Sequence, residues 1–320
     1  MFSFKILSML KKMHSGFAIF FITILLTGQG CKKSTTPPPV VPPPVVPTPV
    51  VVKIYSPLTK KISDQTNLIN TLLSDTLIQI SQGLSETVIT YLNTSSQPMK
   101  VFILEVDLNN PTLRLKAGTP NNSPAFARQT MSDIARTQDT AGNRVLAAVN
   151  GDYFNLTTGV PSSAIYKNGI PIKSQYCTLC TFMSIDDQNK AAIISKDRTV
   201  DTTKIREAIG GKDYLIKNSQ KVTQGDVSIE PRTTVGVTAA NVVYFVLVDG
   251  RSASYSNGIS FSQLSDMFFA LGVKDAINMD GGGSTTLVVK EGASWAVKNR
   301  PSDGGTQRAV ANGWTIVSTQ

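Results

Sequence analysis

The sequence predicts an α+β fold, with a mixed β-sheet core and interspersed helices in a single domain. Segments of strand composition recur along the chain after residue 53, and helical spacing of apolar residues appears only between them. No second linker and no internal repeat divides residues 53–320, which are numerous enough to bury one large core. We therefore expect one domain over residues 53–320.

The first predicted element of the domain is a short helix, in which Leu68, Ile69, Leu72 and Leu73 share a face. A second helix with a partly apolar stripe is expected over residues 123–140, and Asn143 follows it as a helix breaker. Between and after these helices, strand composition predicts strands at 87–92, 100–108, 113–115, 144–150, 164–166, 181–185 and 191–194.

The last third of the domain has clearer patterns. A third helix, 260–271, has Ser260 as its N-cap and Gly272 at the position that tolerates positive φ. Its apolar residues have helical spacing and predict a core-facing side. Around this helix we expect strands at 233–237, 242–248, 276–279, 285–289 and 314–317.

The N-terminal segment, residues 1–30, resembles a bacterial lipoprotein signal peptide. Lys5, Lys11 and Lys12 form a basic region, and the apolar run at 17–26 is shorter than a membrane-spanning helix requires. Small residues then lead to Cys31, the predicted lipidation site. We expect an exported membrane lipoprotein of a bacterial cell envelope, facing the periplasm or the cell surface; plain secretion and an uncleaved anchor are the alternatives.

Residues 31–52 follow as a spacer rich in Pro-Pro and Pro-Val repeats. Proline fixes φ and lacks an N–H, so this stretch predicts an extended polyproline segment that lifts the domain off the membrane.

Composition and net charge limit the classes of partner and substrate that we expect. The chain has 31 Lys+Arg and 22 Asp+Glu, and removing the three signal lysines leaves 28 against 22, or +6. The basic residues are scattered without aromatic interleaving, which predicts no nucleic-acid partner. A mild positive charge suits an anionic substrate, such as a phosphorylated glycan, and equally an ordinary solvated surface.

The only histidine, His14, lies in the signal segment. This excludes Ser-His-Asp and Cys-His catalysis and His-ligated zinc from the mature chain. Carboxylate, arginine, amide, hydroxyl and backbone chemistry remain, and a hard cation such as Ca²⁺ or Mg²⁺ could assist them. The sequence assigns no metal ligands and no certain cofactor.

Cys177 and Cys180 form a Cys-x-x-Cys pair. Only one other cysteine is present, so a four-cysteine zinc site cannot form. Strand-like residues follow Cys180, whereas a thioredoxin-type motif would open a helix. A local structural disulfide between Cys177 and Cys180 is expected in an oxidising compartment.

Polar residues follow apolar strands in several segments, where a rigid scaffold can present side chains to a cleft. These segments are Asn-Gly-Asp-Tyr-Phe (150–154), Glu-Pro-Arg-Thr-Thr-Val-Gly (230–236), Val-Asp-Gly-Arg (248–251) and Asn-Met-Asp-Gly-Gly-Gly-Ser-Thr-Thr (278–286). A fifth segment, Arg-Ala-Val-Ala-Asn (308–312), precedes the last predicted strand. The triple glycine after Asp280 indicates either a tight turn or close approach of a ligand to a nest of backbone N–H groups. No Gly-Lys-Ser/Thr follows, so it is not a nucleotide P-loop.

Together these five segments resemble the phosphodiester glycosidase family, over residues 85–317. Asn-Gly-Asp-Tyr-Phe is similar to the family's Asn-Gly-x-aromatic-Phe, and Asn-Met-Asp-Gly-Gly-Gly-Ser-Thr-Thr is its most distinctive element. The Cys-x-x-Cys is not a feature that we associate with the family. The resemblance implies a single domain of the phosphodiester glycosidase type and an enzyme that hydrolyses a sugar-1-phosphodiester, or a related glycan linkage, at its C1–O bond.

The resemblance also implies roles for site residues. Asp280 would be the general base or nucleophile, with Asp249 second, and Arg232 and Arg308 would clamp the phosphate. The backbone amides of Gly281, Gly282, Gly283 and Ser284 would assist. The remaining predicted substrate-binding residues are Asn150, Asp152, Thr233, Arg251, Asn278, Thr285 and Asn312, of which Asn150 and Asn278 would bind sugar hydroxyls.

Structural alternatives stay open for several of these residues. Asp249 and Asp152 could be turn formers, Arg251 a surface residue, and Asn150 and Asn278 partners of backbone groups at strand ends. Two other functions also remain. One is a non-catalytic glycan-binding or envelope-binding module; the other is a metal-dependent phosphodiesterase that cuts P–O, with Asp249 and Asp280 holding a cation.

Overall fold

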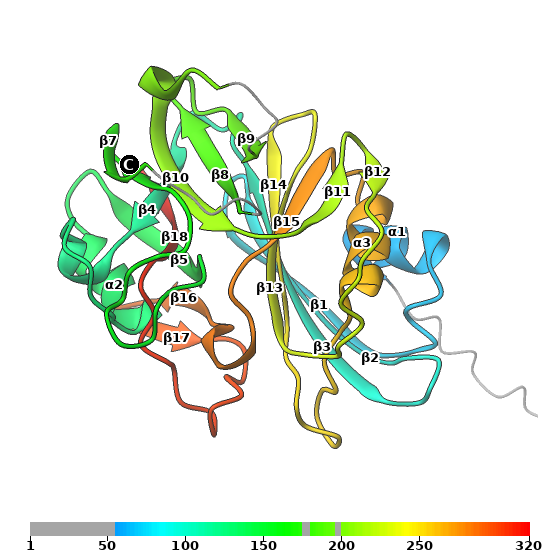
Figure 1. Ribbon diagram of the computed structural model, residues 1–320. Coiled ribbons are helices and arrows are strands. Elements are labelled where there is room, and N and C mark those ends of the chain that lie inside the picture. Colours follow the sequence, from blue (N-terminus) through cyan, green and yellow to red (C-terminus); the bar gives the residue numbers. More distant parts are fainter. Residues whose placement is uncertain (1–54, 175–179, 196–199) are drawn as a thin grey trace, which may run out of the picture. The chain divides into compact units, whose positions relative to one another are not determined.

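The computed structural model describes residues 55–174, 180–195 and 200–320. They belong to one compact unit that extends from Lys53 to Gln320. Three sheets make up most of it, so the fold is α+β but dominated by strands (Figure 1). The described residues contain no helix that is both long enough and apolar enough to cross a membrane.

The large sheet has eight strands. Their order is β1 (Thr71–Ser81), β2 (Leu84–Leu92), β3 (Pro98–Asp107), β14 (Val242–Val248), β13 (Arg232–Val237), β15 (Asp275–Asn278), β11 (Tyr214–Lys217) and β12 (Gln220–Lys221).

Two five-stranded sheets complete the β structure. The second sheet has the order β7 (Ile170–Lys173), β6 (Ile165–Lys167), β10 (Ile205–Gly211), β8 (Thr181–Asp186) and β9 (Ala191–Ser195). The third sheet has the order β17 (Ser294–Val297), β16 (Leu287–Glu291), β5 (Arg144–Asn150), β18 (Gly313–Ser318) and β4 (Leu113–Gly118).

Every strand pairing among the described residues is antiparallel, so the expectation of a mixed sheet was wrong. Short hairpin turns join neighbours such as β2 to β3 and β13 to β14. A parallel neighbour would instead need a crossover of a dozen or more residues.

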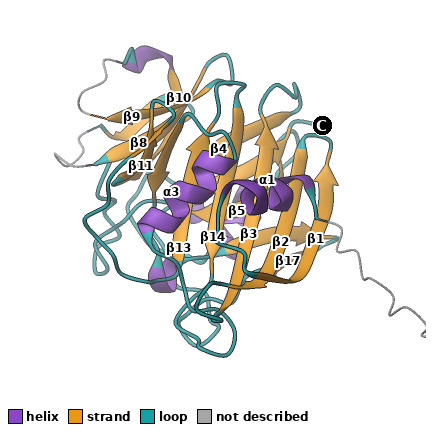
Figure 2. Ribbon diagram, turned by 90° about the vertical axis from the view of Figure 1, so that its right-hand side faces the viewer, coloured by secondary structure: helices purple, strands orange, loops and turns teal. Residues whose placement is uncertain are grey.

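Helices α1 (Pro57–Gln65) and α3 (Phe261–Ala270) cover one face of the large sheet (Figure 2). Leu264 and Phe268 of α3 share a buried apolar cluster with Val101 and Val246 of the sheet. Helix α2 (Met131–Gln138) packs on the third sheet through Met131 and Ile134. A further cluster, rich in residues from all three sheets, fills the space where the sheets meet.

The predicted boundaries of α3 agree with the structure. Ser260 and Gln263 form a reciprocal capping box, and Gly272 has φ +74° just after the helix. Gly236 of β13 lies directly below this helix, because a Cβ there would come within 2.8 Å of the Phe268 ring. A glycine at this position therefore lets α3 approach the sheet.

Two predicted helices were misplaced. Leu72 and Leu73 belong to strand β1, where Leu72 is buried and Leu73 is 53% exposed, so the two side chains lie on opposite faces of the strand and share no helical face. The helix expected over 123–140 begins only at Met131, because Thr130 caps it and Phe126 is exposed. The structure also adds strands that had no predicted counterpart: β1, β7, β10, β11, β12 and β17.

Candidate active site

One cleft collects the residues on which the predicted chemistry depends. Asp280 follows β15, Arg232 begins β13, and Arg308 precedes β18, and all three side chains line this cleft of about 320 Å³. The full lining is Tyr153, Glu230, Pro231, Arg232, Arg251, Asp280, Gly281, Gly282, Gly283 and Arg308. The acid and the two arginines expected to act together are therefore neighbours.

The cleft lies where the large sheet meets the third sheet. The backbone N–H of Asp280 donates to the Gly151 carbonyl (2.9 Å), which joins the end of β15 to the end of β5. The Met279 N–H donates to the Thr233 carbonyl (2.9 Å) and fixes the same strand end against β13. These links hold the Asp280 backbone in place from both sheets.

Burial controls the chemistry of Asp280. Removal from water raises the pKa of its carboxyl to about 6. A hydrogen bond from Ser284 and the positive charges of Arg308 and Lys212 act in the opposite direction. Asp280 is therefore a carboxylate at neutral pH, but a more basic one than an exposed aspartate.

Arg308 lies over the glycine loop. Its Nε donates to Oδ2 of Asp303 (2.9 Å) and its Nη1 to Oγ of Ser284 (3.4 Å). Because Ser284 also hydrogen-bonds Asp280, the arginine and the acid are connected through one hydroxyl.

Arg232 is almost fully buried, yet it lines the cleft. Its Nη2 donates to the Ser228 carbonyl (2.9 Å) and lies 3.5 Å from an oxygen of Asp226. The guanidinium is 3.9 Å from the centroid of the Phe261 ring, the first residue of α3. These contacts fix the orientation of the Arg232 guanidinium.

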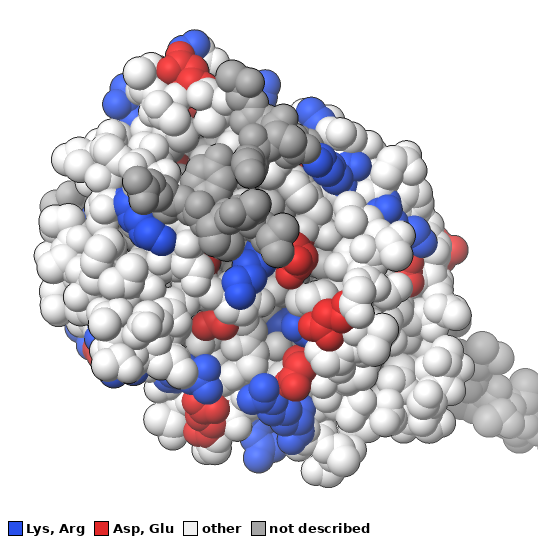
Figure 3. All heavy atoms as spheres, in the orientation of Figure 1, with Lys and Arg blue, Asp and Glu red and all other residues white. Residues whose placement is uncertain are grey.

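Arg251 and Glu230 form an ion pair on the cleft wall, with 2.7 Å between Nε and Oε2. The backbone of Arg251 has φ +59°, which is uncommon for a residue other than glycine. Arg251 is exposed, as the surface alternative predicted, and it also lines the cleft. Figure 3 shows how basic and acidic side chains alternate across the lower middle of this face.

The triple glycine combines a turn with close packing. Gly282 has φ +59°. A Cβ on Gly281 would come within 2.6 Å of the Pro231 carbonyl oxygen, and one on Gly283 would collide with the Arg308–Asp303 pair. The Gly282 and Ser284 amides donate to the carbonyls of Pro231 and Gly281, so they are not free to bind a substrate.

Three predicted substrate-binding residues instead hold strand ends together. Asn150 is fully buried, donates to the Asp280 carbonyl (2.6 Å) and accepts from the Thr233 hydroxyl (2.9 Å). Asn312, also buried, accepts from the Asp152 N–H (2.8 Å). These contacts correspond to the structural alternative, in which such residues organise the cleft without lining it.

Asp152, Asn278 and Thr285 are likewise buried, and each of them, like Asn312, keeps one side-chain polar atom without a hydrogen-bond partner within the described part of the chain. Asp152 accepts from the Ser163 N–H (2.6 Å) through one oxygen only. Burial raises the pKa of Asp152 to about 7, and the charge of Asp280 adds to the effect. Asn278 is fully buried and is not among the residues that line the cleft, so its side chain, like that of Asn150, supports the cleft from behind.

Asp249 does not line the cleft. It is buried and accepts from the Tyr255 hydroxyl (3.0 Å), the Asn299 amide (2.9 Å) and the Arg300 N–H (2.8 Å). Burial raises its pKa, and these three donors oppose the effect. The structure therefore shows Asp249 as an anchor for two loops, in place of the second catalytic acid expected from sequence.

Sequence reasoning missed three residues in and beside the cleft: Tyr153, Glu230 and Lys212. The Tyr153 hydroxyl accepts from the Asn278 amide, and burial raises the pKa of Tyr153. Lys212 Nζ lies 4.1 Å from the centroid of the Tyr153 ring. Tyr153 and Glu230 lie inside two of the segments singled out above, which was the available signal; Lys212 lies in none.

The described residues contain no group of three or more Asp, Glu, His or Cys side chains arranged to hold a metal ion. Asp249 and Asp280, proposed as a shared cation site, are also separated, because only Asp280 faces the cleft. The residues therefore do not fit the cation site of the alternative phosphodiesterase, and we derive no step through a metal.

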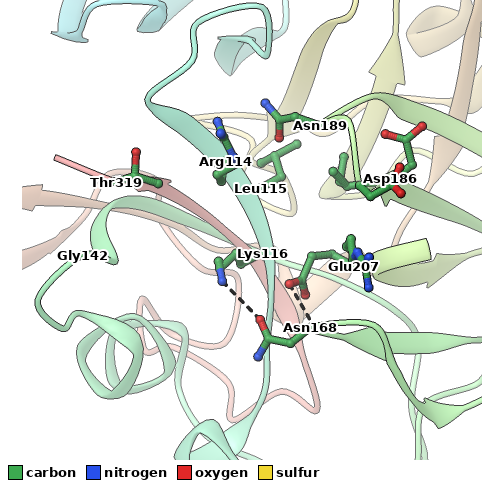
Figure 4. A pocket seen from close by; sticks show the side chains of 12 residues that line it. Arg114, Leu115, Lys116, Gly142, Asn168, Asp186, Asn189, Glu207 and Thr319 are labelled. Carbon is green, nitrogen blue, oxygen red and sulfur yellow. Dashed lines mark hydrogen bonds between the residues drawn. The ribbon is translucent and has the colours of Figure 1, made fainter. Parts of the chain in front are cut away.

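A larger cavity of about 440 Å³ lies between β4 and β10 (Figure 4). Two of its charged groups, Lys116 and Glu207, are engaged by the protein itself. Lys116 donates to Asn168 (3.2 Å), and Glu207 accepts from the N–H groups of Ala117 (3.0 Å) and Asn168 (3.2 Å). None of the predicted site residues lines this cavity, so the smaller cleft remains the candidate active site.

The predicted lipidation site Cys31, the predicted signal segment and the predicted spacer lie outside the described residues, as does Cys177. Cys180 is disulfide-bonded. Its pairing with Cys177 stays a prediction.

The chain belongs to the phosphodiester glycosidase family. The family model matches residues 143–317, more than half of the chain, and this range includes every residue of the cleft. A curated relative, the SPbeta prophage-derived uncharacterized protein YomE of Bacillus subtilis (strain 168), is 34% identical over 106 residues. That match spans 33% of this chain and 16% of the relative's length.

Solved structures show the same fold at low identity. The catalytic domain of zebrafish N-acetylglucosamine-1-phosphodiester alpha-N-acetylglucosaminidase, auto-inhibited by its pro-peptide, aligns with a TM-score of 0.58 at 21% identity; the alignment covers 77% of this chain and 87% of that one. A hypothetical protein from Synechocystis aligns with a TM-score of 0.61 at 13% identity, covering 77% and 64%. These likenesses concern the fold.

Proposed function

We propose that this protein hydrolyses a sugar-1-phosphodiester at the glycosidic C1–O bond. The observation that carries the proposal is the convergence of one half-buried carboxylate, Asp280, and three arginines, Arg232, Arg251 and Arg308, on one cleft. The name of the zebrafish neighbour suggests the first substrate to try, an N-acetylglucosamine-1-phosphodiester.

The proposed reaction needs little proton donation. The bond from C1 to the phosphate oxygen breaks, the phosphate monoester leaves with the electron pair, and the oxygen of water ends on C1. Ordinary glycosidases use a second carboxyl group to protonate the leaving oxygen, whereas a phosphate ester already leaves as a stable anion. Neutralising charge therefore matters more, and guanidinium groups suit that task.

Asp280 would act as nucleophile or general base. A carboxyl whose pKa is about 6 is ionised at neutral pH and still basic enough to accept a proton. Arg308 lies one hydroxyl away from Asp280 and Arg232 is held by Phe261, so the phosphate would be bound beside the reacting carbon.

A matched pair of carboxyl substitutions tests these roles. Asp280→Asn should lower kcat on a sugar-1-phosphodiester by at least about a hundredfold, the scale of losing an acid–base group. Glu230→Gln removes the other cleft carboxyl and should cost much less, since no acid is needed for the leaving group. Near wild-type turnover in Asp280→Asn, or an equal loss in both variants, would contradict the assignment.

We also propose that the protein is exported and held in a bacterial envelope through a lipid on Cys31. The support is the signal-like segment and the proline-rich spacer before the domain. The full chain should fractionate with membranes and Cys31→Ser should move to the soluble fraction. Unchanged membrane retention of Cys31→Ser would oppose the proposal.

A further inference from the structure

A second, smaller hollow adjoins the cleft. It has a volume of about 170 Å³ and lies between the loop that follows β14 and the loop at residues 300–305. Arg251 lines both the hollow and the cleft, so the two spaces meet at this side chain.

Hydrogen bonds to Asp249 hold together the two loops that form the walls of the hollow. Asp249 accepts from the Tyr255 hydroxyl (3.0 Å) on one loop and from the Arg300 N–H (2.8 Å) on the other. The Ser256 hydroxyl donates to the Asp249 carbonyl (2.6 Å) and closes the first loop. One buried carboxylate thus ties both loops together and sets the spacing between them.

The two charged residues that line the hollow are both basic. Its lining includes Arg251 and Arg300 and no acidic residue. The Arg300 guanidinium lies 5.4 Å from the centroid of the Tyr255 ring. Within residues 55–174, 180–195 and 200–320, Arg300 has no ion-pair partner.

The three arginines of the cleft differ from Arg300 because each of them forms an ion pair. Each already faces an acidic residue: Arg232 faces Asp226, Arg251 faces Glu230, and Arg308 faces Asp303. An anion in the second hollow would instead meet Arg300, whose guanidinium forms no ion pair within the described residues. Binding there requires no ion pair of Arg300 to be broken first.

We propose that this hollow is a subsite for the leaving group, and that it recognises a second anionic group beyond the scissile phosphodiester. The inference rests on the proposed function. With Asp280 at C1 and the phosphate on the cleft arginines, whatever extends past Arg251 belongs to the leaving side. The substrate class is therefore a glycan whose phosphodiester is followed by another phosphate or carboxylate, as in a repeating anionic polymer.

The test uses the full chain and three substrates with the same sugar-1-phosphate. The leaving groups are glycerol, which is neutral, glycerol phosphate and glycerate, which separate phosphate from carboxylate recognition. Wild-type protein should show a KM about fivefold to tenfold lower for a charged leaving group, the scale of one solvent-accessible charge-assisted contact. Added salt should weaken this preference.

Arg300→Ala should bring the charged-to-neutral KM ratio to about one, and Ser302→Asp, which places a negative charge in the hollow, should reverse it. Arg144→Ala is the matched control, since Arg144 is exposed at the end of β5 opposite Asn150. It should leave the ratio unchanged. A wild-type ratio near one, or an unchanged ratio in both hollow variants, would overturn the subsite.

Equilibrium binding separates this inference from the proposed function. The Kd values of the same compounds for Asp280→Asn report on the subsite without turnover. If no compound is hydrolysed by wild-type protein but the charged ones bind more tightly and lose that advantage in Asp280→Asn/Arg300→Ala, the subsite stands and the reaction does not. Equal Kd values for charged and neutral compounds overturn the subsite, even if all are hydrolysed.

Discussion

Asp280 and Asp152 are two aspartates in one neighbourhood with different proton affinities. Burial raises the pKa of Asp280 to about 6 and that of Asp152 to about 7. Asp152 lies deeper, and the charge of Asp280 raises its pKa further. As pH rises, Asp280 therefore ionises first, while Asp152 is still largely neutral.

This order predicts the pH dependence of activity. If ionised Asp280 is the reacting form, kcat/KM should rise about tenfold per pH unit below pH 6 and level off above about pH 7. Asp152→Asn should leave the midpoint near 6, because Asp152 carries little charge while Asp280 titrates. A flat profile between pH 4.5 and 7 would contradict the role of Asp280.

The raised pKa values of Asp280 and Asp152 also make the stability of the folded state depend on pH. A buried acid with a raised pKa holds its proton more tightly in the folded chain than in the unfolded one. Between about pH 4 and pH 7 the folded state therefore binds more protons, and these two groups make stability fall as pH rises through that range.

At this scale the sequence identified which residues converge but not what each one does. Asp280, Arg232 and Arg308 could be chosen from strand-end motifs and a family resemblance. That Asn150 and Asp249 direct their polar atoms inward depends on partners such as Thr286 and Arg300, far away in the chain. Local sequence does not contain that information.

At the scale of structural elements, the loop at residues 281–283 shows why the triple-glycine motif requires glycine. Gly281 lets the Pro231 carbonyl approach the loop closely, and Gly283 does the same for the Arg308–Asp303 ion pair. The loop is thus a platform for Arg308, and the Gly282 amide is used by the protein itself.

Gly283→Ala should therefore reduce activity more than stability. The added methyl would collide with the ends of Arg308 and Asp303, which are flexible and can move aside, but Arg308 would leave its place beside Ser284. We expect a loss in kcat/KM of about tenfold or more, with the free energy of unfolding changed by under about 1 kcal/mol. Gly225→Ala, where a Cβ meets nothing within 4 Å, is the control. Unchanged kinetics in Gly283→Ala would oppose this role for the loop.

The fold could be predicted from sequence where local signals were strong. Helix α3 has an N-cap, apolar spacing and a terminal glycine, and its boundaries agree with the structure. Strand β1 was missed because Leu72 and Leu73 fit a helical face over a short window, and only pairing with β2 determines their conformation. Short strands such as β7 and β12 have little pattern of their own and depend on their partners.

For the molecule as a whole, the cleft depends on packing between sheets. Arg232 and Asp280 come from the large sheet, whereas Arg308 leads into β18 of the third sheet. The Asp280–Gly151 backbone bond joins the two, and buried residues such as Met279 and Val149 fill the space around it. The proposed arginine clamp therefore exists only when both sheets are folded together.

Hydrolysis in oxygen-18 water tests the central claim most directly, because it shows which bond breaks. The substrate is a sugar-1-phosphodiester, and mass spectrometry measures the label in both products. Cleavage at C1–O by the Asp280 cleft predicts oxygen-18 in the released sugar and none in the phosphate ester. Label in the phosphate and none in the sugar would mean that the P–O bond is cut, and would contradict the account.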